Sequence, residues 1–215
     1  MNLIDGFVLA GGQSRRMGQN KANLLLGGKT LVNRAALALS VIADQVYAVG
    51  NLTSNITALP IIPDEPVGGN ARGALVGVYT ALLHAKTEWV AVLACDLPFV
   101  TGELLARMVA FLPRVADAHH ENVDAVFAEQ SDGRNQPLCG LYRRDTSLPE
   151  IDKMLADSDW RLQQLRVRLR TRLISFSEIT DIHGAEFLFQ NLNTPDEYRV
   201  AVEIEKQMRL QSVLK

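Results

Sequence analysis

Residues 7–21 read FVLAGGQSRRMGQNK, a short apolar run that leads into a glycine-rich, basic stretch. The run at 7–9 is typical of a buried strand, and glycines permit positive φ angles and close backbone approach. A loop of this kind can turn several backbone N–H groups toward one anion, while Arg15, Arg16 and Lys21 supply full positive charges. The stretch therefore predicts a strand followed by a phosphate-binding loop. The alternative is a glycine-rich turn with solvated basic residues, since short motifs often mislead.

This loop differs from the two common glycine-rich nucleotide motifs. No Gly-Lys-Ser or Gly-Lys-Thr closes it, as a Walker A loop requires. The Gly-x-Gly-x-x-Gly spacing of dinucleotide-binding folds is also absent.

Beyond the loop, short apolar runs alternate with segments of helical period, which is the pattern of an α/β protein with a largely parallel sheet. We expect strands at 7–9, 46–49, 61–62 and 89–93, and helices at 31–42, 75–83, 101–112 and from 194 onward. The run at 89–93, WVAVL, is continuously apolar, as in a strand covered on both faces. It therefore predicts the centre of the sheet.

Two of these helices begin with capping residues. Thr101 can cap the third helix, with Glu103 in the first turn, where the helix dipole favours a carboxylate. Residues 194–197 read TPDE, which combines an N-cap threonine, a proline at the first helical position and a glutamate three residues after the cap. This is the strongest helix start in the chain.

A second candidate motif, Cys95-Asp96-Leu97-Pro98, follows the apolar run at 89–93. Ligands of open α/β sheets sit beyond the carboxyl ends of the strands, so Asp96 is well placed to hold Mg²⁺ on a nucleotide phosphate. The alternative is an aspartate that caps a turn or a helix. Cys95 is expected to be a small buried hydrophobe rather than a nucleophile, because no cation is fixed beside it in the sequence.

The composition limits the class of protein. The 215 residues include 22 lysines and arginines and 24 aspartates and glutamates, which gives a net charge of −2. This balance argues against a general nucleic-acid binder. No apolar run approaches the ~18 residues of a membrane helix, and the first residues lack the basic start of a signal peptide. The two isolated cysteines suggest neither disulfides nor a zinc site. Because no linker or repeat divides the chain, we expect one cytoplasmic domain spanning 1–215.

Other polar clusters favour structural roles. The four histidines, at positions 84, 119, 120 and 183, show no spacing that suggests a catalytic base or a metal site. Residues 161–172 hold five arginines, which alternate with leucine and valine in the second half. This segment could be a basic strand face that meets an anionic substrate or a partner protein, with Trp160 available to stack on a ring of that ligand. A solvated edge strand, with Trp160 in packing, is the interpretation we favour.

Four motifs together resemble the molybdenum cofactor guanylyltransferase family, also described as molybdopterin-guanine dinucleotide biosynthesis protein A. They are LAGGQSRRMGQNK at 9–21, CDLP at 95–98, QPLCGLY at 136–142 and NLNTP at 191–195. The resemblance runs in consistent order from about residue 6 to residue 200. The first motif is typical of the wider nucleotidyltransferase superfamily.

The resemblance implies a Rossmann-like nucleotidyltransferase fold, with a mostly parallel central sheet flanked by helices. It implies that GMP is transferred from GTP to the terminal phosphate of molybdopterin, with release of pyrophosphate and with Mg²⁺ as cofactor. The partners would be GTP, molybdopterin and, transiently, cofactor-delivery proteins, with no nucleic acid and no membrane.

The resemblance also assigns site residues by position. Lys21, Asp96 and Arg15 would be catalytic, and Asp96 would hold the metal. The nucleotide-binding residues would be Leu9, Ala10, Gly11, Gly12, Lys21, Asn51, Asp64, Gly77 and Asp96. Acceptor binding would fall to Asn191 and Asn193. Residues 73–77, GALVG, correspond to a segment that packs near the guanine.

The chain departs from the family pattern at three places. Asn20 stands where an aspartate usually precedes the lysine, which removes one negative charge beside the phosphates. Ala74 replaces a proline, and the family asparagine after the second strand falls nearest Val49, with Asn51 two residues further on. These departures bear on efficiency and base contacts more than on the fold.

Simple chemistry supports the implied reaction. A phosphate monoester has a second pKa near ~6, so the acceptor is mostly ionised at neutral pH and needs no general base. Alternatives remain: a cytidylyltransferase on molybdopterin, a nucleotidyltransferase on another phosphorylated small molecule, or a non-catalytic nucleotide-binding protein, the last motivated by Asn20. Gly11 and the paired asparagines at 191 and 193 favour guanine over cytosine by family pattern.

Overall fold

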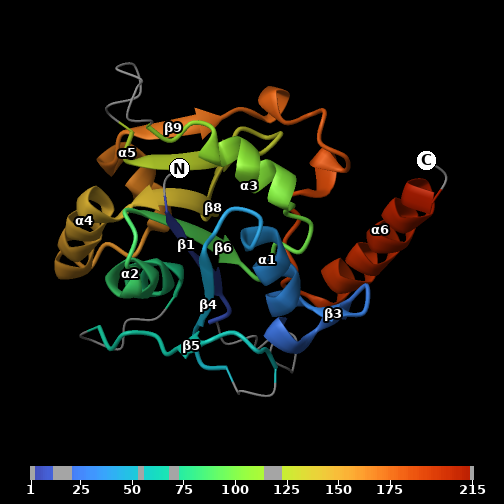
Figure 1. The fold of residues 1–215 in the computed structure, drawn as a ribbon, viewed down its shortest axis with the longest axis horizontal. Coiled ribbons are helices and arrows are strands. Elements are labelled where there is room, and N and C mark those ends of the chain that lie inside the picture. The colour runs from blue at the N-terminus through green and yellow to red at the C-terminus, as the bar shows by residue number, and fades with distance from the viewer. Residues whose placement is uncertain (1–2, 12–20, 53–55, 68–72, 114–122, 214–215) are drawn as a thin grey trace.

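A computed structural model describes residues 3–11, 21–52, 56–67, 73–113 and 123–213 (Figure 1). The strands are β1 Ile4–Leu9, β2 Leu25–Leu26, β3 Lys29–Thr30, β4 Gln45–Val49, β5 Ile61–Ile62, β6 Trp89–Ala94, β7 Ala125–Glu129, β8 Asn135–Arg143 and β9 Thr171–Ile174. The α-helices are α1 Leu31–Leu39, α2 Ala74–His84, α3 Gly102–Val109, α4 Arg144–Ala156, α5 Leu165–Arg168 and α6 Pro195–Val213. Among these described residues, no helix is long and apolar enough to cross a membrane.

The central sheet has seven strands in the order β5-β4-β1-β6-β8-β7-β9. Strand β8 runs antiparallel to both of its neighbours, and every other pair in the sheet is parallel. The mostly parallel sheet expected from the sequence is therefore confirmed. The apolar run at 89–93 lies in β6, the fourth strand of seven, so its central position is confirmed too.

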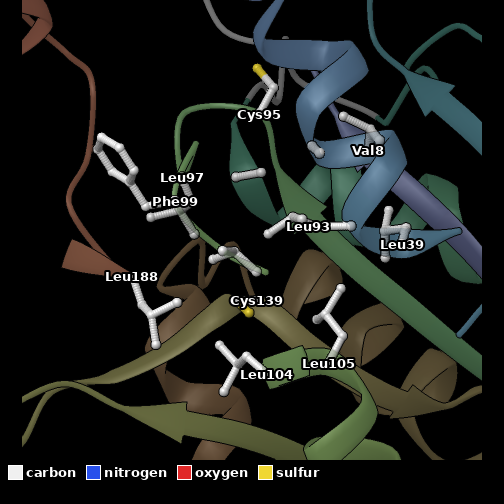
Figure 2. Packing of buried hydrophobic residues seen from close by; sticks show 14 of the residues in the cluster. Val8, Leu39, Leu93, Cys95, Leu97, Phe99, Leu104, Leu105, Cys139 and Leu188 are labelled. Carbon is white, nitrogen blue, oxygen red and sulfur yellow. The ribbon is translucent and has the colours of Figure 1, made fainter. Parts of the chain in front are cut away.

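Helices cover both faces of the sheet, with α1 and α3 on one face and α2 and α4 on the other (Figure 1). Alternating side chains of β1 enter the two cores, since Val8 packs in one hydrophobic cluster and Phe7 in the other. Figure 2 shows the first cluster, where Leu93 of β6 lies near Cys139 of β8 and Leu104 of α3. Because helices cover both faces of the sheet, the β6 sequence is apolar at successive positions rather than at alternate ones.

The expected helix starts are present, whereas two ends differ from expectation. Thr101 accepts a hydrogen bond from the Leu104 N–H at 3.3 Å and caps α3. The helix ends at Val109, and Leu112 is buried beyond it in a turn. Similarly, α1 ends at Leu39, with the Ile42 amide bonded back to the Leu39 carbonyl. In both cases the apolar period continues past the helix because the following turn also packs on the core.

The prediction of a strand across residues 161–172 is wrong for most of that segment. Only β9, at the edge of the sheet, is a strand, and α5 precedes it. Leu162, Leu165 and Leu169 are buried while Val167 is 75% exposed, so the core contacts follow a helical rather than an alternating period. Four of the arginines pair with carboxylates: Arg161 and Arg168 with Asp159, Arg170 with Asp124, and Arg172 with Glu178.

One of these pairs makes folding stability depend on pH. The Arg170 guanidinium donates to both oxygens of the nearly buried Asp124 carboxylate at 2.7 Å, and these bonds lower the pKa of Asp124. A lowered folded-state pKa stabilises the protein above the unfolded pKa of about 4, and this contribution is lost as pH falls through the folded value. We therefore expect Asp124→Asn to reduce stability at neutral pH and to flatten the decline below about pH 4 in urea titrations.

The matched control for this prediction is Asp132→Asn. Asp132 also bonds an arginine, Arg134, but both side chains are exposed, where such pairs contribute little. If stability depended on pH equally in the two variants, the Asp124–Arg170 pair would not contribute to the loss of stability at low pH.

Candidate active site at the carboxyl edge of the sheet

The carboxyl ends of four parallel strands meet at one edge of the sheet. The Ala10 N–H donates to the Val49 carbonyl at 2.9 Å, and the Cys95 N–H donates to the Leu9 carbonyl at 3.0 Å. The Gly50 N–H donates to the Ile62 carbonyl at 2.9 Å. The segments that leave β1, β4, β5 and β6 therefore start side by side.

The connections make this edge the expected ligand-binding site. From β1 the chain passes to β4 and β5 on one side, and then returns through α2 to β6 on the other side of β1. Ligands of open α/β sheets bind at such a reversal, outside the carboxyl ends of the strands. Gly11, where the predicted loop begins, and the predicted motif after β6 flank this point.

Four of the predicted nucleotide-binding residues come together here. A Cβ atom on Gly11 would lie 3.1 Å from Asp64 Oδ2, so the glycine turn lies against the Asp64 carboxylate that follows β5. A Cβ atom on Gly77 of α2 would lie 3.3 Å from Leu9 Cδ1. Desolvation raises the pKa of Asp64, although its side chain still reaches the surface. Leu9, Gly11, Asp64 and Gly77 thus lie on one side of this candidate site.

The sequence analysis missed Gly50, which shapes the glycine turn. Gly50 has φ 127°, and a Cβ atom there would lie 2.7 Å from the Gly11 nitrogen and 2.8 Å from its Cα. Only glycine permits this conformation and this approach of two backbones. A glycine directly after the second strand was the available signal. Asn51, the residue predicted instead, is exposed, and its assignment stays a prediction.

We expect Gly50→Ala to destabilise the protein by roughly 2 kcal/mol or more, because neither the φ angle nor the neighbouring backbone can accommodate a methyl group. Gly28→Ala is the matched control, since Gly28 has φ 82° with no atom within 4 Å of an added Cβ. Urea denaturation of both variants separates the cost of the close approach from that of the φ angle. Equal losses in the two variants would contradict the prediction.

The other side of the candidate site joins three segments that are far apart in the chain. Lys21 Nζ lies 3.5 Å from Asp96 Oδ2 and also donates to Asn193 Oδ1. The Leu192 N–H donates to the Asp96 carbonyl at 3.0 Å, which fixes the segment before α6 beside the loop after β6. The structure therefore brings together Lys21, Asp96 and Asn193, as the predicted site requires. Asn191 is exposed, and its role stays a prediction.

Asp96 has the electrostatic properties of a cation ligand. Its Oδ1 is buried and has no hydrogen-bond partner among the described residues, while its Oδ2 faces Lys21. Burial raises the pKa of Asp96, and the nearby ammonium of Lys21 partly offsets this effect. A buried carboxylate oxygen without a partner is costly, so a cation or water bound at this oxygen would stabilise the ionised carboxylate.

Several predicted residues lie outside the part of the chain that the structure describes. These are Gly12, Arg15, Arg16, Asn20, His119 and His120. Ala10 is buried at the end of β1, where its amide bonds to β4.

Neither cysteine nor histidine supplies a nucleophile or a metal cluster in the described residues. Burial raises the pKa of both Cys95 and Cys139 to about 12, so the expectation that Cys95 is a buried hydrophobe is confirmed. His84 pairs with Glu65 at 2.7 Å on the surface beside α2. Across the described ranges, no three His, Cys, Asp or Glu side chains are grouped as a metal site.

Comparisons with known proteins show the family and the fold of this chain. The family model described as MobA-like NTP transferase domain matches residues 6–172. The "Probable molybdenum cofactor guanylyltransferase" of Geobacillus sp. is 32% identical over 204 residues, covering 92% of this chain and 97% of the relative. The solved structure of "Molybdopterin-guanine dinucleotide biosynthesis protein A" from Archaeoglobus fulgidus superposes with a TM-score of 0.74 at 23% identity, over 94% of this chain and 99% of that chain. "A nucleotidyl transferase" from Methanothermobacter gives a TM-score of 0.70 at 15% identity, over 96% and 99% of the two chains.

Fold and site together define an enzyme of the Rossmann-like nucleotidyltransferase class. The chain belongs to the MobA-like NTP transferases and, within them, to the molybdenum cofactor guanylyltransferase family. The resemblance that the sequence motifs indicated is therefore confirmed.

Proposed function

We propose that this enzyme transfers GMP from GTP to the terminal phosphate of molybdopterin, forming the guanine dinucleotide cofactor and pyrophosphate. The observation that carries the proposal is the convergence of Lys21, Asp96 and Asn193 at the reversal point of the sheet, across from the glycine turn that contacts Asp64. The names of the relatives, molybdenum cofactor guanylyltransferases, support the choice of donor and acceptor.

The site fits a reaction that depends on alignment and charge neutralisation. An oxygen of the acceptor phosphate would bond to the α-phosphorus of GTP while the bond to the bridging oxygen breaks and pyrophosphate leaves. Because the acceptor is already ionised, no general base is required. Lys21 supplies positive charge beside Asp96, and the backbone amides of the predicted glycine loop would supply further donors for the phosphates. We assign Gly12 and Arg15 to the same phosphates, and Leu9, Gly77 and Asp64 to the nucleoside.

The donor set at Asp96 fits Mg²⁺. This cation is commonly held by one or two carboxylates together with substrate phosphates and water, rather than by a cage of protein ligands. The buried, unpartnered Oδ1 of Asp96 provides one such ligand, and the described residues offer no larger cluster. When bound, the metal would neutralise the charge that develops on the phosphates. Asp96 would hold it, and Lys21, positioned beside Asp96, would face the phosphates.

We place acceptor binding at Asn191 and Asn193, in the segment before α6 that bonds to Asp96 and Lys21. Amide side chains can both donate to and accept from the polar edge of a pterin. A cytoplasmic location with transient contacts to cofactor-delivery proteins fits the two free, buried cysteines and the acceptor's place in cofactor synthesis.

A donor competition assay tests the proposal. Purified enzyme, Mg²⁺ and molybdopterin are incubated with GTP, CTP, ATP or UTP, and the dinucleotide product and pyrophosphate are quantified. We expect product with GTP and little with the other three. Product with CTP instead would establish a cytidylyltransferase. GTP binding without transfer to a competent acceptor would establish a non-catalytic nucleotide-binding protein, and either result would overturn the proposal.

A further inference from the structure

The carboxylate of Glu197, in the first turn of α6, does more than cap its helix. Its Oε2 accepts the Thr194 N–H at 2.8 Å, and Thr194 Oγ1 accepts the Glu197 N–H at 3.2 Å, which completes the expected capping box. The same Oε2 also accepts the Asn193 N–H at 2.6 Å. This additional bond lies outside the capping box and fixes the residue that precedes the cap.

That residue connects Glu197 to the candidate active site. The side-chain oxygen of Asn193 accepts a hydrogen bond from Lys21, whose ammonium lies 3.5 Å from Asp96 Oδ2. On the other side of Asn193, the Leu192 N–H is bound to the Asp96 carbonyl at 3.0 Å. The backbone of Asn193 is therefore held from both sides, with Glu197 as its anchor on the helix. Glu197 is also close enough to Asp96 for its charge to act on that carboxyl group.

We propose that Glu197 is a positioning residue, which orients Lys21 toward Asp96 by fixing the Asn193 backbone. The inference deepens the proposed function, on which its kinetic readout rests. A purely structural cap would stabilise α6 without affecting the ammonium of Lys21. The two roles therefore differ in what they predict for Lys21 itself.

The reactivity of the Lys21 amine gives a readout that does not depend on transferase activity. Folded enzyme is labelled with a limiting acylating reagent, and the labelling rate of each lysine is measured by mass spectrometry. Lys86, which is exposed, serves as the internal reference. We expect Glu197→Ala to raise the labelling rate of Lys21 severalfold relative to Lys86, because the Asn193 oxygen is no longer held against the ammonium. Glu197→Gln, which keeps a carbonyl acceptor, should restore much of the protection.

A second capping box in the same chain supplies the matched control. Glu178 Oε2 accepts the Ser175 N–H at 2.9 Å beyond β9, three strands away from β6, and Glu178 pairs with Arg172. Glu178→Ala should therefore remove the cap of a helical turn without changing the labelling rate of Lys21. It should also leave kcat for GMP transfer unchanged. Thermal denaturation of both alanine variants measures the structural loss separately.

A double-mutant cycle identifies the route of the effect. We expect Glu197→Ala to lower kcat by about 10- to 100-fold, and to have little further effect when Asn193→Ala is already present. Unchanged Lys21 labelling in a folded Glu197→Ala enzyme, or additive losses in the cycle, would overturn the proposal. If the native enzyme transfers no GMP, the proposed function fails, yet the labelling experiment still decides the role of Glu197.

Discussion

Asp96→Asn is expected to lower kcat for GMP transfer by about 10²- to 10³-fold or more, while the protein stays folded. The substitution keeps the shape of the side chain but removes the charge on the buried Oδ1 that has no partner among the described residues. A neutral amide is a poor ligand for Mg²⁺ and a weaker partner for Lys21. Steady-state rates over a Mg²⁺ titration measure the loss, and Mn²⁺ binding followed by electron paramagnetic resonance tests the metal role independently of turnover.

The same substitution is expected to stabilise the fold at neutral pH. Burial raises the pKa of Asp96, so the stability it contributes is present below the unfolded pKa of about 4 and is lost as pH rises through the folded value. Asparagine does not ionise and avoids this loss. Urea denaturation at several pH values should therefore show a variant that is at least as stable as the native enzyme at neutral pH. A carboxylate whose replacement stabilises the protein typically serves function rather than structure.

Asp5→Asn is the matched control at the opposite end of the sheet. Asp5 is 3% exposed, lies in the amino half of β1, and accepts the Lys86 N–H at 2.7 Å. Its loss should change stability without changing the Mg²⁺ dependence or kcat. Full turnover in Asp96→Asn at saturating Mg²⁺ would remove Asp96 from the catalytic site.

The fold could be predicted from the sequence wherever the core imposes a clear period. The apolar β6 run indicates a strand covered on both faces, and the TPDE sequence indicates the start of α6. The prediction failed at 161–172, because Leu165, Val167 and Leu169 alternate with arginines as strand residues would. Val167 is in fact exposed, and the buried leucines are three and four residues apart, as in a helix. Local composition alone does not tell which apolar side chains reach the core.

The site was predictable in its residue types but not in its contacts. The glycine loop, Lys21 and Asp96 carry recognisable chemistry, so motif spacing was sufficient to select them. The meeting of Lys21 with Asn193, 172 residues apart, depends on the segment before α6, which the Leu192 N–H fixes to the Asp96 carbonyl. Position 50 requires glycine because the Gly11 backbone lies against it. Glu197 accepts the Asn193 N–H in addition to the bonds of its capping box. These are tertiary relations, which no single stretch of sequence encodes.

Lys21→Met is expected to lower kcat/KM for GTP by about 10²- to 10³-fold, because it removes the ammonium that lies between Asp96 and Asn193. Methionine keeps the apolar stem, so the loss reflects charge and hydrogen bonding rather than packing. Both kcat and KM for GTP should change, since Lys21 is assigned to the phosphates in the ground state and during transfer. Initial rates over a GTP titration at saturating molybdopterin separate the two effects.

Two further variants define the geometric requirement at this position. Lys21→Arg keeps the positive charge, but its planar fork cannot take the place of a compact ammonium held by two oxygens, so we expect only a small recovery. Lys29→Met removes an exposed lysine from β3 and should leave kcat/KM for GTP unchanged. If Lys21→Arg were fully active, general positive charge would suffice and the contact with Asn193 would be incidental. If Lys21→Met matched Lys29→Met, Lys21 would have no part in binding the phosphates, and the site would have to neutralise them through a metal and backbone amides alone.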